Sequence, residues 1–162
     1  MRRKRLIRAL AVPALIAAGA GLWLVLQDSV PNLETADRVT LLSIDGRDRK
    51  VDAPPLAGET VHGYPLLGRV EIYAPDERRR LGDALREGLR GRGGSWAACY
   101  WPRHVLRVER GWSVTEYVIC FQCGNYQRYV NGERRVGGQF GEAVRPAFDE
   151  PLKAAGVPIA PE

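Results

Sequence analysis

The stretch HVLRVERGWSVTEYVICF, residues 104–121, decides the fold class of this chain. It contains two runs rich in β-branched and aromatic residues on either side of Arg110-Gly111-Trp112, an arrangement typical of a hairpin. In the second run Tyr117 and Ile119 share one face and Val118 points to the other, because side chains alternate along a strand. The stretch therefore predicts two antiparallel strands, over residues 104–109 and 113–121.

Further strands are predicted on both sides of this hairpin. Residues 125–130 and 133–136 flank Asn131-Gly132, the strongest two-residue hairpin signal, and so predict a second hairpin. Towards the N-terminus, the apolar run VTLLSI at 39–44 predicts a strand that ends at the turn Asp45-Gly46. One more strand is expected over residues 69–73, after the irregular stretch His62-Gly63-Tyr64-Pro65.

Two segments have the apolar spacing of helices. Leu81, Leu85 and Leu89 recur at helical spacing after Pro75-Asp76, which predicts a helix capped by Asp76 and ended by Gly91. A second helix is expected over residues 144–155, although Pro151 removes one of its hydrogen bonds. Together these elements predict an α+β domain, a small antiparallel sheet covered by two helices.

The N-terminus predicts attachment to a membrane. Residues 9–26 carry no charged side chain, and as a helix they would extend about 27 Å, close to the hydrocarbon thickness of a bilayer. Five basic residues precede this stretch, whereas Asp28, Glu34 and Asp37 follow it, which predicts a cytoplasmic N-terminus. We therefore expect a single N-terminal transmembrane helix, acting as a signal anchor in a bacterial inner membrane.

This interpretation divides the chain into four parts. Residues 1–8 form a basic cytoplasmic flank, 9–26 the anchor, 27–37 a linker, and 38–162 an exported, periplasmic α+β domain. A cleaved signal peptide is the alternative, since Ala18-Gly19-Ala20 offers small residues at an acceptable cleavage position. Cleavage there would leave an exposed apolar N-terminus beginning at Gly21, which favours the retained anchor.

The distribution of charge argues against a nucleic-acid partner. The chain of 162 residues has a net charge of +5, but five of its 24 Lys and Arg residues lie within the first eight positions. The remaining 19 are matched by 19 Asp and Glu. Residues 9–162 are therefore neutral overall and lack the excess of positive charge that phosphate binding requires.

Three cysteines and one histidine could form a local site. Cys99, His104, Cys120 and Cys123 lie within 25 residues as C-x4-H and C-x2-C, and such ligands can hold tetrahedral zinc. In an exported domain the alternative is a disulfide among Cys99, Cys120 and Cys123 with one thiol left over. The sequence leaves the zinc site and the disulfide both open. We therefore expect no cofactor, with zinc as the alternative.

Weaker catalytic hypotheses rest on the same residues. A thiol-redox role for Cys120 and Cys123 lacks the helix N-terminus that would lower a thiol pKa, because a strand is expected next. A Cys99–His104 nucleophile and base has no evident orienting group. A hydrolase would need a pocket that combines His104 or His62 with a carboxylate. The carboxylates considered are Glu109 and Glu116.

The segments Cys99-Tyr-Trp-Pro-Arg-His104 and Val118-Ile-Cys-Phe-Gln-Cys123, with the closing Ala154-Ala-Gly-Val-Pro158, resemble those of a group of uncharacterised small bacterial proteins. These proteins are exported or membrane-anchored, carry C-x-x-P-R-H and I-C-F-x-C segments, and have no assigned activity. The resemblance implies that Pro102 and Arg103 act with the three cysteines and His104 as one local unit. It departs from the group at Val105, where glycine is usual.

These observations favour a non-enzymatic envelope protein. We expect a single-pass membrane protein, held at the membrane by residues 9–26, whose extracytoplasmic domain has a structural role or binds another envelope protein. The alternative function is a metal-binding or thiol-redox domain that uses the cysteine and histidine cluster.

Overall fold

The computed structural model describes residues 30–47, 58–91 and 100–161. The chain divides into two units, residues 1–30 and 31–162, and every element described below belongs to the second. The elements, in chain order, are β1 (Arg38–Ile44), β2 (Thr60–Val61), β3 (Tyr64–Glu71), α2 (Pro75–Arg90), β4 (His104–Arg110), β5 (Ser113–Cys120), β6 (Asn125–Val130), β7 (Glu133–Gln139), the short 3-10 helix η1 (Glu142–Val144) and α3 (Arg145–Ala154).

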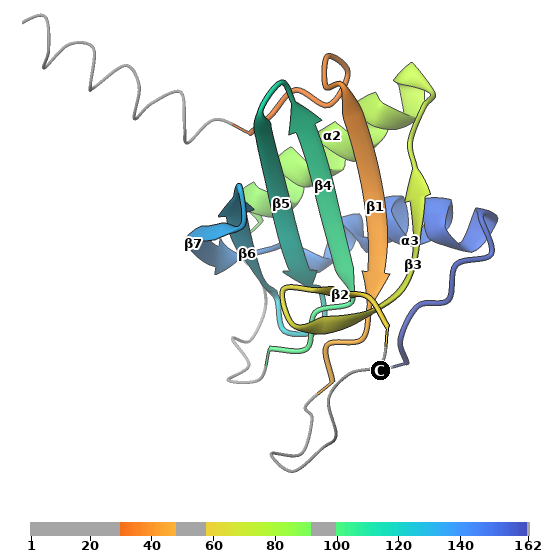
Figure 1. Ribbon diagram of the computed structural model, residues 1–162, viewed down its shortest axis with the longest axis vertical. Coiled ribbons are helices and arrows are strands. Elements are labelled where there is room, and N and C mark those ends of the chain that lie inside the picture. The colour runs from red at the N-terminus through yellow and green to blue at the C-terminus, as the bar shows by residue number, and fades with distance from the viewer. Residues whose placement is uncertain (1–29, 48–57, 92–99, 162) are drawn as a thin grey trace, which may run out of the picture. The chain divides into compact units, whose positions relative to one another are not determined.

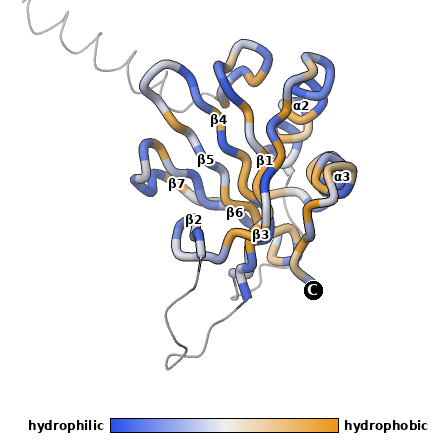
Figure 2. The backbone as a smooth tube through the Cα atoms, turned by 45° about the vertical axis from the view of Figure 1, so that its right-hand side comes forward, coloured by the Kyte–Doolittle hydropathy of each residue, from blue (hydrophilic) through white to orange (hydrophobic). Residues whose placement is uncertain are grey.

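The strands form one curled antiparallel sheet, a half-barrel (Figure 1). Its order is β2-β3-β1-β4-β5-β6-β7, so β1 enters between β3 and β4 although β3 follows it in sequence. The hairpins β4–β5, β5–β6 and β6–β7 are each formed by consecutive strands. Figure 2 shows that β7, at one edge, is mostly hydrophilic, whereas the central strands carry the hydrophobic segments.

Both helices lie on one face of this sheet, behind β1, β4 and β5 in Figure 1. Leu41 of β1 pairs with Leu106 of β4, and both are fully buried. Leu85 of α2 and Phe148 of α3 are also fully buried, because the apolar positions of each helix recur on a single side. This layer between the sheet and the two helices is the main core.

The opposite face of the sheet is covered in part by the chain's own β2–β3 hairpin, which crosses it in Figure 1. Val61 of β2 packs with Leu42, Val105 and Val118 in a second apolar cluster. The hairpin turns at His62 and Gly63, whose φ angles are 50° and 84°. Positive φ at both central residues is the conformation of the type I′ turn, one of the two types that favour two-residue hairpins.

The predicted fold class is wrong. In place of a small sheet covered by two helices behind a membrane span, a seven-stranded half-barrel dominates the domain, and its own hairpin covers part of the second face. Among residues 30–47, 58–91 and 100–161, no helix has the length and apolar character needed to cross a bilayer. The predicted span at 9–26 lies outside these described residues.

Several local predictions are confirmed, and others need correction. The hairpins β4–β5 and β6–β7 lie where the alternating patterns place them. Strand β3 begins at Tyr64 rather than 69, because Pro65 faces the two-residue β2 at the edge. Helix α2 starts at Pro75 with Ala74 as its N-cap, so Asp76 lies inside the first turn instead of capping it.

Candidate functional site

The turn between β5 and β6 is closed by a disulfide between Cys120 and Cys123. The backbone N–H of Cys123 donates a hydrogen bond to Sγ of Cys120 over 3.1 Å. Gly124 follows with a φ of 64°, a conformation that glycine adopts without steric cost. The two cysteines are 1% and 0% exposed, so this bond is part of the core.

The segment leading into β4 lies beside this disulfide. The backbone N–H of Trp101 donates to Sγ of Cys123 over 3.4 Å, and that of Arg103 donates to the carbonyl of Ile119 over 3.2 Å. The His104 ring meets the Phe121 ring edge-on, with 5.1 Å between centroids. Residues 101–104 and 119–123 therefore pack together.

Three of the four predicted zinc ligands have other partners in the structure. Cys120 and Cys123 are bonded to each other, a pairing that the disulfide alternative allowed. His104 Nε2 is engaged with Asp149. Cys99 lies outside the described residues, so the complete zinc set stays a prediction. Within the described part of the chain, no group of three or more His, Cys, Asp or Glu side chains is arranged to hold a metal ion.

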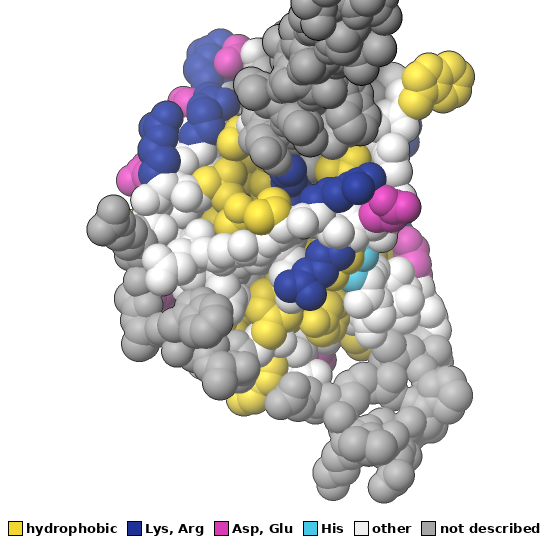
Figure 3. Space-filling view, turned by 90° about the vertical axis from the view of Figure 1, so that its left-hand side faces the viewer, with side chains coloured by type: hydrophobic (Ala, Val, Ile, Leu, Met, Phe, Trp, Pro, Cys, Tyr) yellow, Lys and Arg dark blue, Asp and Glu magenta, His cyan; other side chains and the backbone are white. Residues whose placement is uncertain are grey.

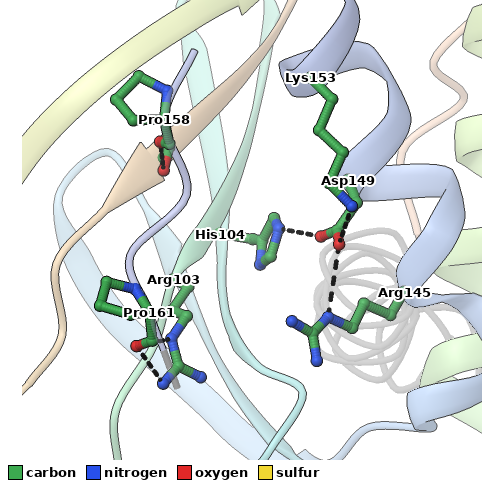
Figure 4. A network of polar contacts seen from close by, with 8 residues as sticks. Arg103, His104, Arg145, Asp149, Lys153, Pro158 and Pro161 are labelled. Atoms are coloured by element: carbon green, nitrogen blue, oxygen red, sulfur yellow. Dashed lines mark hydrogen bonds and ion pairs between the residues drawn. The ribbon is translucent and has the colours of Figure 1, made fainter. Parts of the chain in front are cut away.

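His104 and Asp149 form a buried pair between β4 and α3. The Nε2 atom of His104 lies 2.8 Å from Oδ1 of Asp149. The other carboxylate oxygen accepts a hydrogen bond from Lys153 over 3.0 Å and lies 3.6 Å from Nε of Arg145 (Figure 4). Because Arg145, Asp149 and Lys153 are spaced by four residues, they share one face of the helix. The pair thus fastens the last helix to the centre of the sheet.

The protonation of this pair follows from its burial. Burial lowers the pKa of His104 and outweighs the opposing effect of the hydrogen bond to Asp149, so the imidazole is neutral at pH 7 and donates from Nε2. For Asp149, burial alone would raise the pKa. The hydrogen bonds from His104 and Lys153, with the charge of Arg145, reverse this effect and lower the pKa to about 2. Nδ1 of His104 has no hydrogen-bond partner among the described residues.

The C-terminal segment after α3 lies over the neighbouring strand ends. Ser43 Oγ donates to the carbonyl oxygen of Pro158 over 2.6 Å. The guanidinium of Arg103 donates twice to the carbonyl of Pro161, over 3.1 Å and 2.8 Å (Figure 4). Gly68 allows this approach, since a Cβ there would lie 2.8 Å from Cγ1 of Val157. Ser43 and Arg103 therefore hold this segment in place.

A second histidine–carboxylate pair lies on the hairpin-covered face. His62 Nε2 is 2.9 Å from one oxygen of Glu116, and Arg107 Nε donates to the other over 2.8 Å. The imidazole also stacks on Tyr129, with 3.6 Å between ring centroids. These contacts join the β2–β3 turn to β4, β5 and β6, which we call the hairpin latch (His62, Arg107, Glu116 and Tyr129).

Among the described residues, two hollows stand out. A groove of about 190 Å³ separates α2 from α3 and is lined by Ile72, Glu77, Arg80, Leu81, Ala147, Glu150, Pro151 and Ala154. A second hollow, of about 230 Å³, lies at the β2–β3 turn and is lined by Asp45, Gly46, Arg47, Gly63, Tyr64, Pro65 and Tyr100. Neither lining includes a histidine, so neither supplies the pocket that the hydrolase hypothesis required of His62 or His104.

On the side of the molecule that Figure 3 shows, Arg and Lys side chains alternate with apolar patches and acidic groups. Arg38, for example, lies near both Glu71 and Glu109. This arrangement agrees with the equal numbers of basic and acidic residues in positions 9–162.

Sequence reasoning missed Asp149, Arg145 and Ser43. Asp149 is 45 positions from His104 and adjoins the inward-facing Phe148, so its four-residue spacing from Arg145 and Lys153 was the only available signal. Glu116 was considered as a partner for His62, and the structure does bring these two side chains together.

Comparison of the chain with models of protein families, with curated proteins and with solved structures finds no match.

Proposed function

We propose that this protein is an extracytoplasmic binding domain, held at a bacterial inner membrane by residues 9–26 with the N-terminus in the cytoplasm, and without catalytic activity of its own. The observation that carries this proposal is the buried disulfide between Cys120 and Cys123. Disulfides persist in exported proteins and are rare in the reducing cytosol. The five basic residues before the apolar stretch favour the same orientation.

The roles of the two histidine–carboxylate pairs support binding rather than catalysis. His104 is 1% exposed, and its partner Asp149 joins α3 to the sheet. His62 and Glu116 fasten the β2–β3 hairpin. In both pairs the polar groups hold elements of the domain together, a use that accounts for their burial.

The groove between α2 and α3 is the surface best suited to a protein partner. Its floor is apolar, formed by Leu81 and the half-buried Ala147 and Pro151, while Glu77 and Arg80 are exposed at its rim. An apolar centre with a charged rim is the usual composition of a protein–protein contact. We propose that an apolar side chain or helix face of an envelope protein enters this groove.

A reporter enzyme tests the compartment. Alkaline phosphatase fused after Glu162 is active only when it is exported, whereas β-galactosidase at the same position is active only in the cytoplasm. The proposal requires an active phosphatase fusion that stays in the membrane fraction after carbonate washing. An active β-galactosidase fusion would refute export, and release of the phosphatase fusion by carbonate would refute retention at the membrane.

Photo-crosslinking tests the groove. A benzoylphenylalanine at Ala154, in the groove, should give a discrete protein adduct in cells, and the same group at the exposed Arg135 of β7 should not. Adding Ala147→Arg, which fills the groove with a charged side chain, should remove the adduct at 154. Equal adducts at both positions, or an adduct that survives Ala147→Arg, would contradict binding in the groove.

A second function, thiol–disulfide exchange, is favoured by one observation: the C-x-x-C pair is oxidised. Exchange requires attack by a thiolate on an accessible sulfur, and both sulfurs belong to buried residues. Turnover of a model disulfide by the reduced full-length protein, abolished by Cys120→Ser, would establish this function. Zinc bound by the reduced protein and lost in His104→Gln would instead support the metal-binding alternative.

A further inference from the structure

Trp112 lies at the tip of the β4–β5 hairpin with its side chain in solvent. It is 98% exposed, although tryptophan is mostly buried in folded proteins. The turn that carries it is held firmly: the backbone N–H of Gly111 donates to Asp37 Oδ2 over 2.6 Å, and Arg110 donates to the hydroxyl of Thr35. A rigid turn thus presents a large apolar ring that contacts almost nothing in the domain.

The chain enters the domain at this same end of the sheet. The backbone N–H of Asp37 donates to the carbonyl of Glu109 over 2.9 Å, and Leu33 is buried at 1% exposure. Residues 33–37 are therefore fixed beside the turn that carries Trp112, as Figure 1 shows for the segment before β1. Only residues 27–32 separate this fixed segment from the apolar stretch 9–26, and six residues extend at most about 20 Å.

A second exposed aromatic side chain shares this end. Tyr73 is 72% exposed and follows β3, which ends where β1 begins because the two strands are antiparallel. Its hydroxyl donates to Glu71 over 2.9 Å, and Arg38 lies near both Glu71 and Glu109. These contacts place Tyr73 and Trp112 at one end of the sheet, on either side of the start of β1.

We propose that this end of the domain, which carries Trp112 and Tyr73, rests on the lipid bilayer, with the Trp112 ring in the headgroup region. The proposal rests on the proposed attachment through residues 9–26, which brings the entry point of the chain to the membrane. Indole and phenol rings favour the membrane interface, since one part of each ring system is apolar and the other forms hydrogen bonds. A bilayer is the occupant because the short linker keeps this end within its reach.

The charges at this end predict which lipids are needed. Arg38 and Arg110 are already engaged with Glu71, Glu109 and Thr35. Contact should therefore depend on the aromatic rings rather than on anionic headgroups. We expect the same behaviour in zwitterionic phosphatidylcholine vesicles as in vesicles that contain phosphatidylglycerol.

The test uses full-length protein labelled with 5-fluorotryptophan in phosphatidylcholine vesicles. The chain has four tryptophans, and Trp112→Phe assigns the fluorine signal of residue 112. A lipid spin-labelled in its headgroup broadens fluorine nuclei at the interface, and a water-soluble gadolinium chelate broadens those in solvent. As a matched control, Glu59→Trp in the Trp112→Phe background places the reporter beside β2, at the opposite end of the sheet.

The expected result is that the labelled lipid broadens the Trp112 signal more than about twofold beyond the control signal, as an interfacial indole requires. If the protein floats with the vesicles but both signals respond only to the gadolinium chelate, this inference is overturned and the membrane attachment stands. If the protein does not float with vesicles, the attachment through residues 9–26 fails, and the inference fails with it.

Discussion

Nε2 of His104 lies 2.8 Å from Oδ1 of Asp149, and this contact joins the first residue of β4 to the last helix of the chain. The same carboxylate accepts a hydrogen bond from Lys153, which lies one turn further along α3. The two residues are 45 positions apart, so the pattern of apolar residues does not reveal this buried polar contact.

Replacing Asp149 should destabilise the protein more than replacing its exposed neighbour. Asp149→Ala leaves His104 buried without its acceptor, which costs about 2–3 kcal/mol of unfolding free energy. Glu150→Ala removes an exposed carboxylate and should change the unfolding free energy by less than about 0.5 kcal/mol. Urea unfolding followed by circular dichroism measures both, and equal effects would show that the His104–Asp149 contact has no stabilising role.

Stability should fall as the pH is lowered from 7.5 to 5. Burial lowers the pKa of His104 in the folded protein, so the unfolded chain binds this proton more readily. The contribution of neutral His104 to the free energy of unfolding is fully present above the ordinary histidine pKa of about 6.5. It is lost as the pH falls below this value, by at most about 1.4 kcal/mol per pH unit. Urea unfolding at several pH values should show a shallower dependence for His104→Gln. An unchanged dependence would contradict this role.

Asp149, whose pKa is lowered to about 2, should make the free energy of unfolding depend on pH in a more acidic range. Its contribution is present above the ordinary aspartate pKa and is lost as the pH falls towards 2. This range lies below that of His104, so the two effects can be measured separately in the same titration.

Opening of the hairpin latch should be local. His62→Ala removes the contact with Glu116 and the stacking on Tyr129, which together should cost about 1–2 kcal/mol. Hydrogen exchange should become faster at residues 60–66, which include the turn of the β2–β3 hairpin, and stay unchanged in α2. Arg47→Ala removes an exposed ion pair near the same turn and serves as the control. Uniformly faster exchange through α2 would show that the latch acts on the whole domain.

Two glycines of α2 should respond to alanine with opposite signs. At Gly88 a Cβ would lie 2.3 Å from Cζ of Phe140, so Gly88→Ala should destabilise by about 1–3 kcal/mol through overpacking. At Gly82 the nearest atom is the flexible guanidinium of Arg86 at 3.6 Å. Gly82→Ala should therefore stabilise the helix by about 0.5–1 kcal/mol. Thermal unfolding distinguishes the two, and the same sign for both would contradict the packing of Phe140 against α2.

The elements that could be predicted from sequence are those specified by local pattern. The β4–β5 and β6–β7 hairpins follow from alternating side chains around Gly111 and Gly132, and α2 follows from the spacing of its leucines. Strand β2 was missed because its two residues carry no alternation, and Pro65 obscured the start of β3. The number of strands and the curl of the sheet depend on pairing between distant segments, which local pattern does not contain.

The candidate site was predictable only where its residues are close in sequence. The spacing of Cys120 and Cys123 indicated a joint role, and the two are bonded. Contacts between distant segments, such as His104 with Asp149 and Ser43 with Pro158, arise from the packing of α3 and the C-terminal segment against the sheet. Their partners are therefore determined by tertiary structure and not by any motif.

The oxidation state of Cys120 and Cys123 inside living cells tests the central claim of an exported, disulfide-containing domain most directly. Cells expressing the full chain are quenched in acid, the free thiols are alkylated, and the tryptic peptide of residues 111–128 is weighed before and after reduction. Export predicts that both cysteines resist alkylation until they are reduced, whereas a chain lacking residues 1–26 and kept in the cytoplasm is alkylated at both. Alkylation of Cys120 and Cys123 in the unreduced full-length protein would contradict the account.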